Sequence, residues 1–164
     1  MRPPKPDGIP AEHASDEQRI RATAVALLAR REHSRHELLT KLVRRGYDEA
    51  ACERVVEDLA GRALVSDRRF VESFLAHRSG RGQGPVRIRA ELRERGVDSS
   101  AIEDAIDSAE VHWTALAASV RRRRFGAALP KDFAARAKQA RFLQYRGFTQ
   151  DQIRAAMGGE DDES

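Results

Sequence analysis

Apolar residues recur along this chain at intervals of three and four positions, the spacing that places them on one face of an α-helix. Within this periodicity, one pattern occurs three times at intervals of about 50 residues. A leucine stands four residues before a glycine, and an apolar residue and then a helix-capping residue follow that glycine. The three copies are Leu42, Gly46, Tyr47, Asp48; Leu92, Gly96, Val97, Asp98; and Leu143, Gly147, Phe148, Thr149.

Each copy of the pattern predicts two helices joined by a tight turn. The leucine is the last core-facing residue of the first helix, and the glycine ends that helix in the left-handed conformation that a Cβ disfavours. The capping residue then opens the second helix, and Thr149 with Gln152 has the spacing of a capping box. A third apolar stripe precedes each pair of helices, and these stripes contain Ile20, Phe70 and Trp113.

The sequence therefore predicts an all-α protein of three tandem three-helix repeats that form an elongated, curved molecule. We expect the repeats at 16–64, 65–111 and 112–158, a disordered and dispensable tail at 1–15, and a dispensable acidic tail at 159–164. Composition supports this architecture, because hydrophobic residues are 40% of the 164 positions but aromatic residues only 5%. A core of Ala, Leu, Val and Ile suits close helix packing.

Charge is distributed unevenly along the chain, and the net charge of +4 hides this. Residues 19–159 hold 28 basic and 18 acidic side chains, and the third repeat, at 113–157, holds ten basic and two acidic ones. The helix expected at 99–110 is acidic instead. A basic surface of this kind favours an acidic protein groove or a phosphate backbone as partner.

Candidate chemistry is sparse. Cys52 is the single cysteine and falls on an apolar stripe, which indicates a small buried side chain and a reducing, cytoplasmic location. His33 and His36 lie three residues apart, but no Cys, His or carboxylate cluster completes a metal site. The Gly-rich segment at 79–85 lacks the Lys-Ser/Thr of a phosphate loop, and no apolar run is long enough to span a membrane. We expect no enzymatic activity, metal or cofactor.

Three segments resemble the signature segments of the RecX family: LARREHSRHELLTKL at 28–42, VSDRRFVESFLAHR at 65–78 and GPVRIRAELRERGV at 84–97. The resemblance covers about residues 19–157, and the third repeat is the most divergent. It implies a regulator that lies in the groove of a RecA filament on DNA. There the protein would restrain ATP hydrolysis and strand exchange in recombination, DNA repair and the SOS response. Some members of the family also contact single- or double-stranded DNA.

Arginines on the predicted surface are the candidate contacts to RecA or DNA, and we expect the protein to bind as a monomer. The run at the end of the first helix of the third repeat is solvent-exposed in this interpretation, because positive charge complements the helix dipole there. The candidates are Arg68, Arg69, Arg78, Arg81, Arg87, Arg121, Arg122, Arg123, Arg124, Lys138 and Arg141.

Two other classes of function remain open. A stand-alone nucleic-acid-binding protein could use the helix pairs around each glycine, which resemble helix-turn-helix units in outline. The helices at 49–60 and 99–110 are acidic or neutral on balance, however, which is the wrong sign for a groove lined with phosphates. An enzyme is the weakest alternative, because the sequence offers no nucleophile and base pair and no paired catalytic acids.

Overall fold

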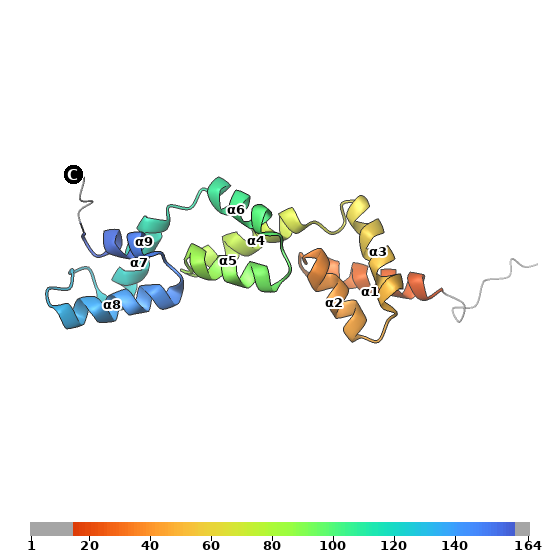
Figure 1. The fold of residues 1–164 in the computed structure, drawn as a ribbon, viewed down its shortest axis with the longest axis horizontal. Coiled ribbons are helices and arrows are strands. Elements are labelled where there is room, and N and C mark those ends of the chain that lie inside the picture. Colours follow the sequence, from red (N-terminus) through yellow and green to blue (C-terminus); the bar gives the residue numbers. More distant parts are fainter. Residues whose placement is uncertain (1–14, 160–164) are drawn as a thin grey trace, which may run out of the picture. The chain divides into compact units, whose positions relative to one another are not determined.

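The structure, a computed structural model, describes residues 15–159, and within this range the chain forms nine α-helices and no strand (Figure 1). This order confirms the prediction of an all-α fold with three helices in each repeat. The backbone divides after Ser66 into two compact units, of which the first holds α1–α3 and the second α4–α9. The helices are α1 (Asp16–Arg30), α2 (Arg35–Arg44), α3 (Glu49–Gly61), α4 (Asp67–Gly80), α5 (Pro85–Glu94), α6 (Ser99–Ser108), α7 (Trp113–Phe125), α8 (Phe133–Arg146) and α9 (Gln150–Ala156).

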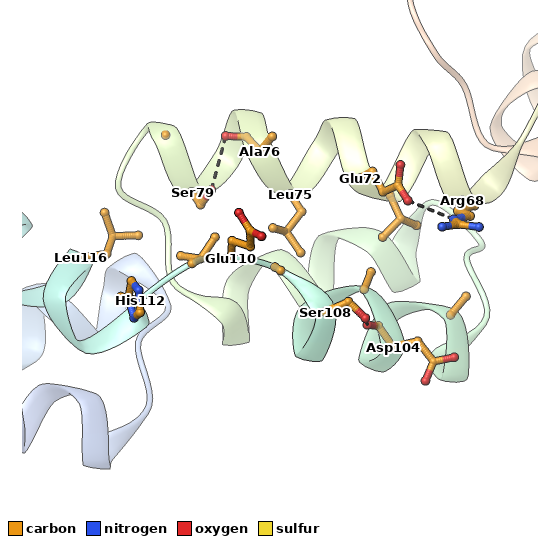
Figure 2. Close-up of a pocket in the computed structure, with 16 residues that line it drawn as sticks. Arg68, Glu72, Leu75, Ala76, Ser79, Asp104, Ser108, Glu110, His112 and Leu116 are labelled. Carbon is orange, nitrogen blue, oxygen red and sulfur yellow. Dashed lines mark hydrogen bonds and ion pairs between the residues drawn. The ribbon is translucent and has the colours of Figure 1, made fainter.

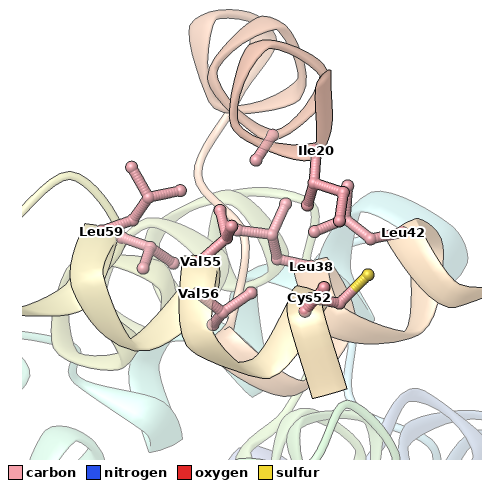
Figure 3. Packing of buried hydrophobic residues seen from close by; sticks show 10 residues of the cluster. Ile20, Leu38, Leu42, Cys52, Val55, Val56 and Leu59 are labelled. Atoms are coloured by element: carbon pink, nitrogen blue, oxygen red, sulfur yellow. The ribbon is translucent and has the colours of Figure 1, made fainter. Parts of the chain in front are cut away.

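The first unit is one three-helix repeat with a single apolar core. Side chains from all three helices meet there, and Figure 3 shows α3 supplying Cys52, Val55, Val56 and Leu59 toward Ile20, Leu38 and Leu42. Cys52 is completely buried, as expected for an inert apolar position. Burial in this aliphatic core, near the carboxylates of Asp48 and Glu49, raises the pKa of the Cys52 thiol.

Helix starts and stops follow the predicted chemistry. The side chains of Ser34, Asp48 and Asp98 each accept a hydrogen bond from a backbone N–H in the first turn of α2, α3 and α6. Thr149 and Gln152 form a complete capping box at the start of α9. The repeated glycines have the expected positive φ angles, with values of 95° at Gly46, 75° at Gly96 and 96° at Gly147.

The second unit contains two cores, one for each remaining repeat. The core of the second repeat joins Phe70, Val71, Leu75, Ile88, Leu92, Val97, Ile102 and Ile106, and that of the third joins Ala117, Val120, Leu143, Phe148, Ile153, Ala156 and Met157. The position of Trp113 differs from the sequence-based prediction. We expected it in the third core, but it packs against the second one, because α7 begins at Trp113, only a short connection after α6 ends at Ser108.

Backbone contacts join the second and third repeats inside this unit. The N–H of Gly84 donates to the carbonyl of Arg146 at 2.8 Å, and the N–H of Val86 donates to the carbonyl of Gly147 at 2.9 Å. A Cβ at Gly84 would collide with the backbone of Gly147. The sequence analysis treated the Gly-rich segment only as a loop. In the structure, the absence of a side chain at Gly84 permits close contact between the second and third repeats.

Candidate interaction surfaces

Arg121 is not part of an exposed arginine run, contrary to the sequence-based prediction. Only 2% of its surface is exposed. Its guanidinium donates to the carbonyl oxygens of Gly126, Ala127 and Ala128 at 3.4, 3.3 and 3.2 Å, and to Oε1 of Gln139 at 3.4 Å. Arg121 points inward because α7 packs on α8. Its side chain holds the loop between these two helices, so we no longer count Arg121 among the candidate contacts to RecA or DNA.

The other arginines of this run are available to a partner. Arg122, Arg123 and Arg124 are exposed in the last turn of α7, and Lys138 and Arg141 are exposed on α8. Together α7 and α8 carry eight basic residues and no acidic one. This surface of the third repeat is therefore strongly positive and suited to an anionic partner.

The candidate arginines of the second repeat are partly neutralised by neighbouring acids. Arg78 and Arg87 both approach Glu91, each with Nε 3.2 Å from a carboxylate oxygen, and both are partly buried. Arg78 also lies over the ring of Phe74 at 4.7 Å from its centroid. Such residues contribute to the structure of the repeat as well as to its surface.

Arg68 and Arg81 are more accessible than the other candidate arginines of this repeat. Arg68 is exposed and pairs with Glu72 at 3.0 Å, a surface ion pair worth at most about 1 kcal/mol. Arg69 is half-buried, whereas Arg81 is exposed just after the end of α4. Exposed positive charge therefore lies near both ends of α4, at Arg68 and at Arg81.

Tyr145 is a surface feature that the sequence analysis missed. It is 77% exposed near the end of α8, and the guanidinium of Arg87 lies over its ring at 5.6 Å from the centroid. Lys138, Arg141 and Tyr145 follow the three-and-four spacing of one helix face. That spacing could have identified the shared helix face from the sequence. The contact between Tyr145 and Arg87 could not be identified in this way, because it depends on the packing of the second repeat on the third.

An apolar cleft of about 1110 Å³ lies between α4 and α6 and extends to the start of α7 (Figure 2). Apolar side chains dominate its lining, and they are Val71, Leu75, Ala76, Ala101, Ala105, Ala109, Val111 and Leu116. The carboxylates of Glu72, Asp104 and Glu110 also line the cleft. A cleft with this lining is suited to receiving apolar side chains of a partner.

The acidic character of α6 is only partly neutralised within the second repeat. Arg89 donates two hydrogen bonds to Glu103, at 2.6 and 3.0 Å. This contact holds the pKa of Glu103 below its ordinary value. Asp104 and Asp107 remain exposed on the same helix, so negative charge persists beside the cleft.

His33 and His36 do not belong to a metal site within the part of the chain that the structure describes. His33 is buried, its Nδ1 lies 3.0 Å from the carbonyl oxygen of Arg31, and its Nε2 lies 3.0 Å from Nζ of Lys41. His36 is exposed. Within residues 15–159 there is no cluster of three or more His, Cys, Asp or Glu side chains that could hold a metal, and no helix long and apolar enough to cross a membrane.

Comparison with known proteins assigns each repeat separately. The family models for the first, second and third three-helix domains of RecX match residues 21–59, 66–106 and 114–157, in that order. The chain belongs to the RecX family. Its relatives include Regulatory protein RecX of Halorhodospira halophila, which is 48% identical over 93% of this chain and 95% of its own length. Regulatory protein RecX of Pseudomonas putida KT2440 is 45% identical over 87% of this chain and 91% of its own length.

Solved structures agree at the level of the fold. The crystal structure of RecX from Lactobacillus salivarius superposes with a TM-score of 0.74 at 20% identity, covering 87% of this chain and 95% of that one. Three-helix domains in tandem are thus shared across RecX proteins of low sequence identity. The relatives carry the name of a regulatory protein and not of an enzyme, which confirms the expectation of a non-catalytic chain.

Proposed function

We propose that the protein binds the groove of the RecA nucleoprotein filament and restrains RecA's ATP hydrolysis and strand exchange, acting as a monomer in the cytoplasm. One observation carries this proposal: all three RecX domains occur in order across the described chain, in a protein similar over nearly its whole length to proteins named Regulatory protein RecX. The cleft and the basic third repeat supply surfaces on which such a regulator could dock.

The proposal has a direct kinetic test. Purified protein is titrated into RecA assembled on single-stranded DNA while ATP hydrolysis is followed, and strand exchange is measured in parallel. We expect both rates to fall as the protein is added. Unchanged rates at saturating protein would contradict the proposed function, whatever the protein binds otherwise.

The apolar cleft is the part of the second repeat that we assign to RecA. Contiguous exposed apolar surface typically marks protein contacts. Ala76 lies on the exposed side of α4 and lines the cleft, so Ala76→Arg places a guanidinium in it without entering the core. We expect at least about a tenfold loss of filament affinity, because an apolar partner surface would then bury an unpaired charge.

Ala90→Arg is the matched control for this substitution. Ala90 is exposed on α5 in the same repeat and is not part of the cleft lining. The control should bind the filament as the unsubstituted protein does. Equal affinity of the two variants would rule out the cleft as the RecA contact and direct attention to Arg68, Arg69 and Arg81.

A further inference from the structure

We infer that the apolar cleft of the second repeat takes a helix of RecA whose apolar face is flanked by lysine or arginine residues. The inference deepens the proposed function and rests on it, because RecA is taken as the protein that supplies the helix. The cleft then selects a partner segment of the opposite charge to the one that suits the third repeat.

The walls of the cleft have the shape of a helix-binding groove. α4 and α6 form them, and small side chains such as Ala76, Ala101 and Ala105 line both. Small side chains let a third helix approach at the short end of the usual interaxial range, about 8 Å. α6 is ten residues long, which is about 15 Å or nearly three turns of a partner helix. An apolar groove of this kind is a common binding site for the apolar face of an amphipathic helix.

The hydroxyl groups in the cleft do not call for a polar partner. Ser79 donates a hydrogen bond to the carbonyl oxygen of Ala76 at 3.3 Å, which Figure 2 draws, and Ser108 donates to the carbonyl oxygen of Asp104 at 2.6 Å. Both hydroxyls are thus satisfied within their own helices. A partner can cover these walls with apolar side chains without leaving either hydroxyl unpaired.

Two carboxylates of the cleft have no counter-charge. Glu72 is paired with Arg68 at 3.0 Å. Asp104 and Glu110 form no ion pair with any other residue that the structure describes, and both are exposed (Figure 2). A partner that covers the cleft takes these carboxylates out of water, which costs free energy unless a cation comes with it. Lysine or arginine beside an apolar helix face meets this requirement.

The sign of these charges separates the cleft from the third repeat. α7 and α8 carry eight basic residues and no acidic one, so their surface attracts anionic groups. A partner segment that suits those helices would be repelled by Asp104 and Glu110. The cleft and the third repeat therefore need different segments of the partner.

The first test uses two synthetic peptides and the full chain, with no RecA present. Both peptides are about 15 residues long and carry leucines on one helical face. One has lysines beside that face and the other has glutamates. We expect the lysine peptide to bind at least about tenfold more tightly in fluorescence anisotropy, and the difference to shrink as salt is raised. Equal affinity for the two peptides would overturn the inference.

Asp104→Lys tests the same contact with the lysine peptide and with the RecA filament. Asp104 is exposed, so the new ammonium stands in the cleft without entering the core. We expect this variant to bind both partners at least about tenfold more weakly, because a base of the partner then meets a like charge. Asp104→Asn should give a smaller loss in the same direction, and circular dichroism should show that both variants retain their helices.

Asp107→Lys is the matched control. Asp107 is exposed on the same helix, about 60° further round from Asp104, and is not part of the cleft lining. The control changes the net charge by the same amount, so it reports any general electrostatic attraction. It should lower either affinity by no more than about threefold. Equal losses in Asp104→Lys and Asp107→Lys would overturn the contact in the cleft.

The peptide and filament measurements separate failure of this inference from failure of the proposed function. If the unsubstituted chain leaves RecA's ATP hydrolysis unchanged but prefers the lysine peptide, the proposed function fails and the preference of the cleft for a basic helix is upheld. If ATP hydrolysis is restrained but the two peptides bind equally and the two lysine variants act alike, the proposed function stands and this inference is overturned.

Discussion

Replacing Arg121 by Ala tests the largest difference between the expected and the observed arginine run. In the sequence, four consecutive arginines are chemically identical, and any one of them could be the residue that turns inward. In the structure, the first is buried between α7 and α8, and the next three are exposed. Arg121→Ala should therefore destabilise the second unit, whereas Arg123→Ala should leave its stability unchanged within about 0.5 kcal/mol.

The expected magnitude follows from the contacts of Arg121. A hydrogen bond to a charged group contributes about 1.5 to 3 kcal/mol, and the guanidinium makes four, all long at 3.2 to 3.4 Å. Two effects lower the total. The carbonyl acceptors belong to exposed loop residues that water can reach, and the buried Nε has no hydrogen-bond partner. We expect a net loss of about 2 to 4 kcal/mol in the free energy of unfolding.

Urea denaturation can follow the second unit selectively, because the chain's one tryptophan, Trp113, belongs to that unit and packs against one of its two cores. For a slope of about 1 to 3 kcal/mol/M, the urea midpoint of Arg121→Ala should fall by about 0.7 M or more. Arg121→Lys should recover little of this, since an ammonium cannot reach the same set of acceptors. If Arg121→Ala and Arg123→Ala have the same midpoint, the guanidinium does not hold the loop and our interpretation of this contact is wrong.

Further predictions concern the other buried groups. Gly147→Ala should lower the free energy of unfolding by about 2 to 5 kcal/mol, measured by thermal or urea unfolding, because the new Cβ would collide with Arg87 and the backbone φ is 96°. Gly46→Ala has open space around it and should lower that free energy by only about 1 to 2 kcal/mol. Leu42→Ala should destabilise the first unit by about 2 to 5 kcal/mol through a core cavity, measured by circular dichroism. Burial lowers the pKa of His33, so the first unit should lose stability as pH falls below about 6.5, where the unfolded chain binds the proton more readily; His33→Gln should lack this slope in pH-dependent unfolding.

The protonation state behind the histidine prediction follows from its two contacts. A backbone carbonyl can only accept a hydrogen bond, so Nδ1 of His33 carries the proton and donates a hydrogen bond to the carbonyl oxygen of Arg31. Nε2 then accepts from the ammonium of Lys41, which it can do only while the ring is neutral. Protonation in acid would place two cations in contact, so the charged ring is disfavoured in the folded chain. An unfolding free energy independent of pH between 7 and 5 would contradict this assignment.

The local structure of the protein could be predicted from the sequence because its causes are local. Glycine at the end of a helix, a capping side chain at the start of the next and apolar spacing between them act over four or five residues. The positions Gly46, Asp48 and Thr149 therefore behave in the structure as their chemistry predicts. The threefold repetition of these signals indicated the all-α architecture and the number of helices.

Long-range packing decided what the sequence could not. Arg121 and Arg123 carry the same side chain, and only the crossing of α7 on α8 determines that the first is buried and the second is exposed. Tyr145 meets Arg87 across 58 positions of the chain because the repeats dock through Gly84 and Gly147. A residue's propensity and its place on a helix face are properties of its neighbours in sequence. Its burial and its contacts depend on which faces of separate helices come together, and that choice is made by the whole packed unit.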